Sequence, residues 1–189
     1  MKNFNIIIFL GVDGSGKSTL INAISNGNKK KFHTIHFIPD FFRKNKKSIT
    51  NPHGKKKRSK IYSFIKVIYW LINFELFIIL NRNSKKIFIF DRYIYDVIID
   101  PLRYRFSLSE KMTNIFLKYI IKPDLIVLLS GNPKKIYVRK KELKLKEIIR
   151  LNTRYNKFVQ KFNSKIILNS FSKINYNKKK ILNYIKKIK

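Results

Sequence analysis

The sequence predicts an α/β fold in which a parallel sheet is covered by helices on both faces. Three observations predict it. Short apolar runs alternate with segments of helical spacing, a glycine-rich loop follows the first apolar run, and the 189 residues suffice for a sizeable core. Short apolar runs are typical of strands buried on both faces of a parallel sheet. We therefore expect one domain over residues 1–189.

Each expected element follows from a local pattern. Ser109 is the predicted N-cap of its helix, and Pro123 ends the segment before the fourth strand. Residues 41–60 are rich in Lys, Asn, Ser, Pro and Gly, which predicts a mobile loop over the site. The predicted strands are 4–10, 33–38, 87–90, 125–129 and 165–169. The predicted helices are 17–26, 60–80, 109–120, 133–141, 146–160 and 173–188.

A phosphate-binding motif follows the first predicted strand directly. Residues 11–19 read GVDGSGKST, which matches the P-loop spacing G-x-x-x-x-G-K-[ST]. Its glycines let the backbone approach a polyphosphate, Lys17 reaches the β- and γ-phosphates, and the Ser18 hydroxyl ligates Mg²⁺. The motif therefore predicts ATP and Mg²⁺ as cofactors. The expected nucleotide-binding residues are Gly11, Asp13, Gly14, Ser15, Gly16, Lys17, Ser18 and Thr19.

Composition limits the remaining function classes. The chain has no cysteine, which excludes disulfides, thiolate metal sites and a thiol nucleophile. It carries 43 Lys and Arg against 10 Asp and Glu, a net charge of +33. Two interpretations stay open: a codon bias toward A/T-rich triplets, or attraction to nucleic acid or an anionic membrane. We expect no specific nucleic-acid partner, because no binding-fold signature accompanies the charge, and we expect a cytoplasmic protein, because no signal peptide is visible.

One predicted helix is as long and apolar as a membrane span. Residues 61–80 contain Lys66, Asn73 and Glu75, and a charge at the centre of a span costs about 2.5–3.5 kcal/mol on insertion scales. A buried or interface helix is therefore favoured over a spanning one. Contact with a lipid surface, without a span, stays open, as does a homodimer.

A second candidate constellation ends the third predicted strand. Residues 87–93 read IFIFDRY, a β-branched and aromatic run followed by acid, arginine and tyrosine. An aspartate at the end of a strand beside the P-loop can hold Mg²⁺ or its water, and the adjacent arginine can bind a second phosphate. Asp91 and Arg92 are therefore expected to act with the P-loop, and Ser18 and Asp91 are the expected metal ligands.

Together, these motifs resemble the thymidylate kinase family of P-loop kinases. The resemblance extends to Lys122-Pro123-Asp124-Leu125 before the fourth strand and to the basic stretch 139–155. It implies a three-layer P-loop kinase fold with a five-stranded parallel sheet. It also implies an ATP-dependent phosphotransferase that converts dTMP to dTDP.

The resemblance implies a role for each matching residue. Asp13 would approach the sugar of the acceptor, Asp91 would sit near the metal, and Arg92 would clamp the acceptor phosphate. The lid, at about residues 139–150, would bring arginines to the transferring phosphoryl group as an arginine finger does. The catalytic residues so implied are Lys17, Asp91, Arg92, Arg139, Arg150 and Arg154.

Departures from the family pattern leave the acceptor open. Asn51-Pro52-His53-Gly54-Lys55 stands where the family has Arg before Pro-Gly-Gly, and no glutamine precedes Gln160, so a base-reading Tyr-Gln stretch is missing. Residues 51–55 and 100–105 are similar to a thymidylate kinase-like branch associated with surface-polysaccharide gene clusters. A sugar, nucleotide-sugar or lipid-linked acceptor is the first alternative. A non-catalytic ATP-binding protein at an anionic membrane or nucleic acid is the second. Arg103 and Arg105 are either an acceptor anion site or part of a basic surface.

Overall fold

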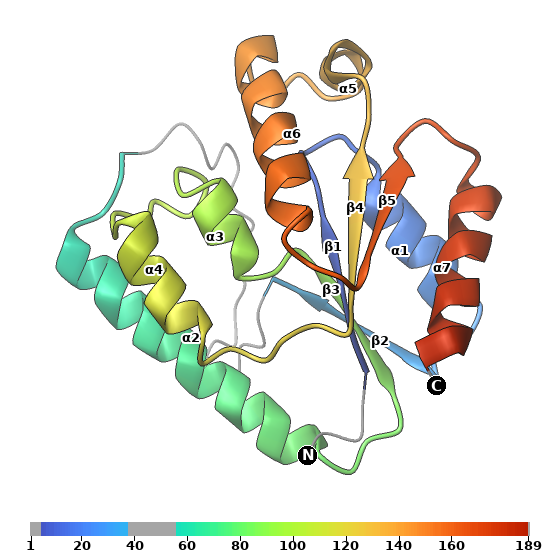
Figure 1. Ribbon diagram of the computed structural model, residues 1–189, viewed down its shortest axis with the longest axis horizontal. Coiled ribbons are helices and arrows are strands. Elements are labelled where there is room, and N and C mark those ends of the chain that lie inside the picture. The colour runs from blue at the N-terminus through green and yellow to red at the C-terminus, as the bar shows by residue number, and fades with distance from the viewer. Residues whose placement is uncertain (1–4, 38–55, 189) are drawn as a thin grey trace.

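The predicted fold class is confirmed by a computed structural model that describes residues 5–37 and 56–188. Five strands form one all-parallel sheet in the order β2-β3-β1-β4-β5 (Figure 1). The strands are β1 (Asn5–Leu10), β2 (Phe32–His36), β3 (Ile87–Asp91), β4 (Leu125–Ser130) and β5 (Lys165–Asn169). The helices are α1 (Lys17–Ser25), α2 (Lys60–Asn81), α3 (Tyr95–Ile99), α4 (Glu110–Leu117), α5 (Pro133–Arg139), α6 (Leu145–Val159) and α7 (Ile174–Ile188).

Two apolar cores separate three layers. Alternate residues of β1 point to opposite faces, so Ile6, Ile8 and Leu10 join one core while Ile7 and Phe9 join the other. The first core packs against α2, α3 and α6, and the second packs against α1 and α7. Figure 1 shows the sheet between these two groups of helices. Burial on both faces explains why the three central strands are almost continuous runs of Ile, Leu, Val and Phe.

The predicted boundaries agree closely with the observed ones, and side-chain caps account for two helix starts. The Ser109 hydroxyl accepts from the Met112 N–H as expected, and the Ser59 hydroxyl accepts from the Tyr62 N–H at the start of α2. The predicted loop 41–60 lies mostly outside the described residues, together with His53 and the segment 51–55. Helix α3 was not predicted from the sequence.

Candidate active site

The P-loop begins where β1 ends, in the centre of the sheet. Gly11, Gly14 and Gly16 have φ values of 139°, 84° and 90°, a region that residues with a Cβ rarely adopt. At Gly11 a Cβ would lie 2.5 Å from the Leu129 carbonyl oxygen of β4, so only glycine fits there. The loop runs directly into α1, whose first residue is Lys17. The backbone therefore has the conformation that the phosphate-binding motif requires.

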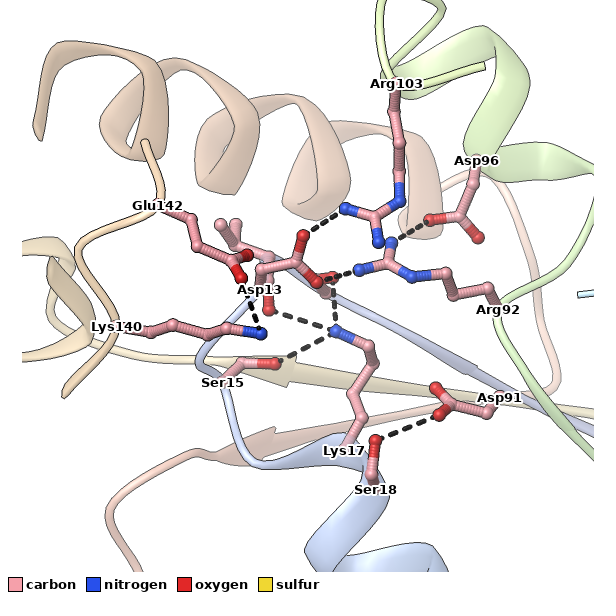
Figure 2. Close-up of polar contacts among 12 residues, drawn as sticks. Asp13, Ser15, Lys17, Ser18, Asp91, Arg92, Asp96, Arg103, Lys140 and Glu142 are labelled. Atoms are coloured by element: carbon pink, nitrogen blue, oxygen red, sulfur yellow. Dashed lines mark hydrogen bonds and ion pairs between the residues drawn. The ribbon is translucent and has the colours of Figure 1, made fainter. Parts of the chain in front are cut away.

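Lys17 is folded back onto the loop that carries it. Its Nζ donates to the Gly11 carbonyl at 2.7 Å and to the Val12 carbonyl at 3.0 Å, and it lies 3.5 Å from the Ser15 hydroxyl (Figure 2). Burial, followed by the nearby Arg92 guanidinium, lowers the pKa of Lys17 to about 7. The hydrogen bonds of this buried ammonium go only to neutral oxygens. The negative charge of an incoming polyphosphate would therefore stabilise its protonated form.

Ser18 and Asp91 form a pair of oxygen donors beside the loop. The Ser18 hydroxyl donates to Asp91 Oδ2 at 2.9 Å, and β1–β3 pairing places Asp91 opposite Phe9. Burial opposes ionisation of Asp91, but the nearby His36 side chain, followed by the charge of Lys17, lowers its pKa below the ordinary value. The other oxygen, Asp91 Oδ1, is buried and has no hydrogen-bond partner among residues 5–37 and 56–188.

These donors fit Mg²⁺. A hydroxyl and a carboxylate are the hard oxygen ligands that this ion prefers, and the unpartnered Asp91 oxygen is an acceptor without a donor. No group of three or more His, Asp or Glu side chains within the described ranges is arranged to hold a metal. The ion would therefore take its remaining ligands from phosphate oxygens and water, which is its usual mode in phosphotransferases.

Two arginines converge on Asp13 of the P-loop. Arg92 forms an ion pair with one Asp13 oxygen and Arg103 forms an ion pair with the other (Figure 2). Arg92 also lies 3.2 Å from the fully buried Asp96. Although burial opposes it, the charges of Arg92 and Arg103 hold the pKa of Asp13 well below its usual range. Asp13 is therefore an anion that positions two guanidinium groups.

Asp96 ties this cluster to α6. The Tyr155 hydroxyl of α6 donates to Asp96, and so does the Tyr93 N–H at 3.0 Å. Burial raises the pKa of Tyr155 well above its usual value, with the Asp96 carboxylate as the next cause, so the hydroxyl stays protonated. Arg92 itself has φ 76°, a strained conformation for a non-glycine residue, and its N–H donates to the Phe9 carbonyl. The Arg92 guanidinium is thus held by Asp13 and Asp96, and its backbone by Phe9 of β1.

The three candidate lid arginines lie in different surroundings. Arg139, the last residue of α5, has its guanidinium 3.4 Å from the Gly14 carbonyl and over the Phe171 ring, 4.5 Å from its centroid. Arg150 pairs with Glu147 at 2.8 Å on the exposed side of α6. Arg154 donates to the Ile98 carbonyl at 2.7 Å and so ties α6 to α3. Of these three, Arg139 is the one that contacts the P-loop.

Other candidate residues lie at the edge of this arrangement. Ser15 is fully buried within the loop, and Thr19 is exposed in the first turn of α1. Lys140 and Glu142 form an exposed ion pair next to the loop (Figure 2). Arg105 does not join Arg103, because its Nε donates to the Lys56 carbonyl near the start of α2.

His36 was not among the candidate residues from the sequence, yet its Nδ1 lies 3.7 Å from Asp91 Oδ2. The strand register gives the signal that could have identified it, because His36 and Asp91 are paired residues at the ends of β2 and β3. The sequence left open whether Arg103 belongs to an acceptor anion site or to a basic surface. Its ion pair with Asp13 brings it into the candidate site.

The fold is shared with known nucleotide and nucleoside kinases. A thymidylate kinase from Candida albicans superposes with a TM-score of 0.65 at 17% sequence identity, over 97% of this chain and 91% of that one. A deoxyadenosine kinase from M. mycoides with bound dATP superposes with a TM-score of 0.61 at 16% identity, over 96% of this chain and 99% of that one. The same enzyme with products dCMP and dCDP bound gives a TM-score of 0.61 at 18% identity, over the same shares. No protein-family model matches the sequence, and no curated protein matches it. At these identities the comparisons show the P-loop kinase fold that the sequence resemblance implied.

Proposed function

We propose that this chain is an ATP- and Mg²⁺-dependent phosphotransferase whose acceptor is itself a phosphate ester, with a nucleoside monophosphate, dTMP by default, as the first candidate. The observation that carries the proposal is the arrangement around Asp13. It gathers the P-loop lysine and the guanidinium groups of Arg92 and Arg103 around one carboxylate, close enough for the Arg92 charge to lower the pKa of Lys17. A P-loop lysine with two further guanidinium groups beside it suits a donor phosphate and an acceptor phosphate brought end to end.

The donor side follows from the P-loop. Its backbone N–H groups and Lys17 would bind the β- and γ-phosphates, while Ser18 and Asp91 would hold the metal. When bound there, Mg²⁺ would neutralise phosphate charge and orient the donor oxygens. Arg139 would add a positive charge at the edge of the loop, where the γ-phosphate leaves. Each of these groups supplies position and charge, which is the main protein contribution to phosphoryl transfer.

The acceptor class follows from whether a carboxylate of the site could act as a general base. An alcohol acceptor needs a base to remove its proton, whereas a phosphate oxygen is already ionised near neutral pH. Asp13 is held by two guanidinium groups, Asp96 by Arg92 and Tyr155, and Asp91 by Ser18. The pKa values of Asp13 and Asp91 are both lowered, whereas a general base needs a raised pKa. A phosphate acceptor is therefore favoured over a free hydroxyl.

Tyr104 supports an anionic acceptor at the same place. Its hydroxyl is buried, and in the described part of the chain it has no hydrogen-bond partner. Burial, with the Asp96 charge as the next cause, raises the pKa of Tyr104 well above its ordinary value, so the hydroxyl remains a donor. A donor that adjoins Arg103 in sequence and lies within the field of Arg92 can bind an oxygen of the acceptor.

The experiment is a measurement of ADP release from ATP with a panel of acceptors. The panel contains dTMP, other nucleoside monophosphates, sugar phosphates, nucleotide sugars and polyprenyl phosphate, with nucleosides and free sugars as hydroxyl controls. We expect turnover with a phosphate ester and none with the hydroxyl controls. A kcat/KM for dTMP above about 10⁴ M⁻¹s⁻¹ would establish thymidylate as a natural acceptor. Turnover of a free hydroxyl acceptor alone would contradict the proposed acceptor class.

The Lys17→Ala variant is the matched control for the donor site. It removes the ammonium that neutralises the transferring phosphate, so phosphoryl transfer should be lost while the fold is kept. Wild-type turnover by this variant would overturn the assignment. ATP binding without turnover for any acceptor would favour the alternative, a non-catalytic ATP-binding protein.

A further inference from the structure

Asp96 is a fully buried carboxylate on α3. Its Oδ1 accepts from the Arg92 guanidinium at 3.2 Å and from the Tyr155 hydroxyl of α6, while its Oδ2 accepts from the Tyr93 N–H at 3.0 Å. Because the side chain has no contact with solvent, water cannot replace a donor that is lost. The orientation of this carboxylate therefore depends on its protein donors.

The buried Arg92 guanidinium lies between Asp96 and Asp13, and Figure 2 shows its contacts with both. A buried guanidinium needs neighbouring anions to balance its charge. Asp13 divides its two oxygens between Arg92 and Arg103. An acceptor phosphate that binds these two arginines would compete with Asp13 for both of them. Asp96 would then remain as the anion that keeps Arg92 in place.

The Tyr155 hydroxyl is a neutral donor to Asp96. Burial raises the pKa of Tyr155 well above its usual value, so the hydroxyl keeps its proton. A neutral donor stabilises the Asp96 anion and leaves its negative charge available to Arg92. Tyr155 is 59 residues from Asp96 in the chain, so this hydrogen bond also joins α6 to α3. The orientation of the Asp96 carboxylate is therefore coupled to the position of α6.

Further contacts between α6 and α3 fix the place of the Tyr155 hydroxyl. Arg154, the preceding residue of α6, donates to the Ile98 carbonyl of α3 at 2.7 Å. The Tyr95 ring of α3 packs against the Phe158 ring of α6, with 5.4 Å between the ring centroids. These contacts lie on both sides of Tyr155 along α6. The hydroxyl is thus held opposite the carboxylate before any ligand binds.

We propose that Asp96 and Tyr155 are positioning residues for the acceptor phosphate. Tyr155 orients the Asp96 carboxylate, and Asp96 holds the Arg92 guanidinium where it meets that phosphate. This inference rests on the proposed function, in which Arg92 binds the acceptor. Both residues act through Arg92 and not by contact with the reacting atoms. The competing explanation is a purely structural role, in which the Tyr155 ring packs α6 onto the core and its hydroxyl has no effect on the acceptor.

Tyr155→Phe separates the two roles, because it removes the hydroxyl and keeps the ring. The acceptor is dTMP, or the phosphate ester of the panel with the highest turnover. We expect the acceptor KM to rise about threefold to tenfold and the KM of ATP to stay within about twofold of wild type. The control Tyr93→Phe removes another buried hydroxyl of the same core, one that donates to the Ile121 carbonyl, and should leave the acceptor KM within about twofold. An equal rise in both variants, or no rise in Tyr155→Phe, would overturn the proposal.

A double-mutant cycle tests whether Tyr155 acts through Asp96. Asp96→Asn keeps the shape of the side chain and removes its charge, so the acceptor KM should rise about tenfold or more. Adding Tyr155→Phe to this variant should raise the KM by less than about twofold further, because the hydroxyl then has no anion to orient. Independent, multiplying effects of the two substitutions would contradict the proposal. Circular dichroism and ATP binding show that each variant is folded, and if Asp96→Asn does not fold, the comparison of Tyr155→Phe with Tyr93→Phe still decides.

Hydrogen exchange of the Arg92 guanidinium gives a readout that does not depend on turnover. Its N–H signals in the ligand-free protein are identified by NMR as those missing from Arg92→Lys. Buried, hydrogen-bonded groups exchange slowly, so Tyr155→Phe should speed this exchange at least about threefold, whereas Tyr93→Phe should leave it unchanged. Unchanged exchange in Tyr155→Phe would overturn the positioning role even in an active enzyme. Faster exchange in a protein that phosphorylates no phosphate ester would support the hold of Tyr155 on Arg92 and contradict the proposed function instead.

Discussion

The charge of Lys17 depends on what lies in the P-loop. Its ammonium is buried against carbonyl oxygens, and the pKa of about 7 means that about half of the molecules lose this charge at neutral pH. Below pH 7 the lysine is charged in both the folded and the unfolded chain. Between about pH 7 and its ordinary value of 10.5 the unfolded chain holds a proton that the folded chain has released. The free protein therefore gains stability as pH rises through this window.

ATP should reverse this behaviour, because its phosphates stabilise the charged lysine. We expect ATP binding to take up close to one proton at about pH 8.5, where the free lysine is almost wholly neutral, and its affinity to fall as pH rises above about 7. Calorimetric titration in buffers of different ionisation enthalpy measures the uptake. Lys17→Met is the control and should show none. Equal binding enthalpies for the wild type in all buffers would contradict the lowered pKa.

Arg103 is the second residue whose role can be separated by kinetics. It pairs with Asp13 and is less buried than Arg92, so its removal leaves Asp13 paired with Arg92. Arg103→Ala should raise the KM of the acceptor about tenfold or more and leave the KM of ATP nearly unchanged. The control Arg105→Ala removes a neighbouring arginine that is bound to the Lys56 carbonyl, and its acceptor KM should stay within about twofold of wild type. A rise in the KM of ATP alone would place Arg103 on the donor side.

Individual residues differ in how far the sequence predicts their place. The P-loop spacing fixes the backbone itself, so Gly11, Lys17 and Ser18 could be assigned in advance. Asp91 follows from its position at a strand end. The Arg103–Asp13 ion pair could not be predicted, because it joins residues that are far apart in the chain and depends on how the segment after α3 folds back. These site assignments stay predictions until ligands or variants test them.

Among the elements, the segment predicted to form a lid shows why helical position alone does not identify a candidate catalytic arginine. Helix α5 ends against the P-loop, where a Cβ on Gly14 would lie 2.9 Å from the Lys140 Cβ, and this contact brings Arg139 to the loop. Helix α6 turns Arg150 toward Glu147 and Arg154 toward α3. Basic residues on one stretch of chain therefore have three different environments.

Alanine variants of Arg139, Arg150 and Arg154 should differ in kcat and in their free energy of unfolding. Arg139→Ala should lower kcat by about tenfold or more, because it removes a charge beside the transferring phosphate. Arg150→Ala should change kcat less than about twofold, because an exposed ion pair contributes little. Arg154→Ala should lower the free energy of unfolding by about 1–3 kcal/mol, because the Ile98 carbonyl loses a charged donor. Steady-state kinetics and urea unfolding of all three measure this. A larger kcat loss for Arg150→Ala than for Arg139→Ala would contradict the order.

The elements themselves were largely predictable, with one informative exception. Strand β5 agrees residue for residue with the prediction, because an apolar run between polar residues has few alternatives. Helix α3 was missed, because all five of its residues are buried and show no helical alternation of apolar and polar positions. Its formation depends on tertiary contacts such as the Arg154–Ile98 hydrogen bond. Helical periodicity predicts helices that have a polar face, and it fails for a short helix that is buried all round.

At the scale of the whole molecule, repulsion between like charges destabilises the folded state, and burial of apolar side chains stabilises it. A net charge of +33 on 189 residues repels itself and weakens the compact state, while the two cores oppose this repulsion. The ion pairs described within the chain are few, and the site uses several of them. Charge screening should therefore stabilise this protein more than it weakens its ion pairs.

Thermal unfolding in increasing NaCl tests this balance. The screening length falls from about 30 Å at 0.01 M to about 8 Å at 0.15 M, so repulsion between distant lysines is largely removed. We expect Tm to rise by several degrees over this range, at about 2–4 °C for each kcal/mol. The variant Lys178→Gln/Lys179→Gln/Lys180→Gln lowers the net charge by three and should show a higher Tm at low salt and a smaller rise. A Tm that falls as NaCl is added would contradict the prediction, because it would mean that native ion pairs outweigh the repulsion of the excess lysines.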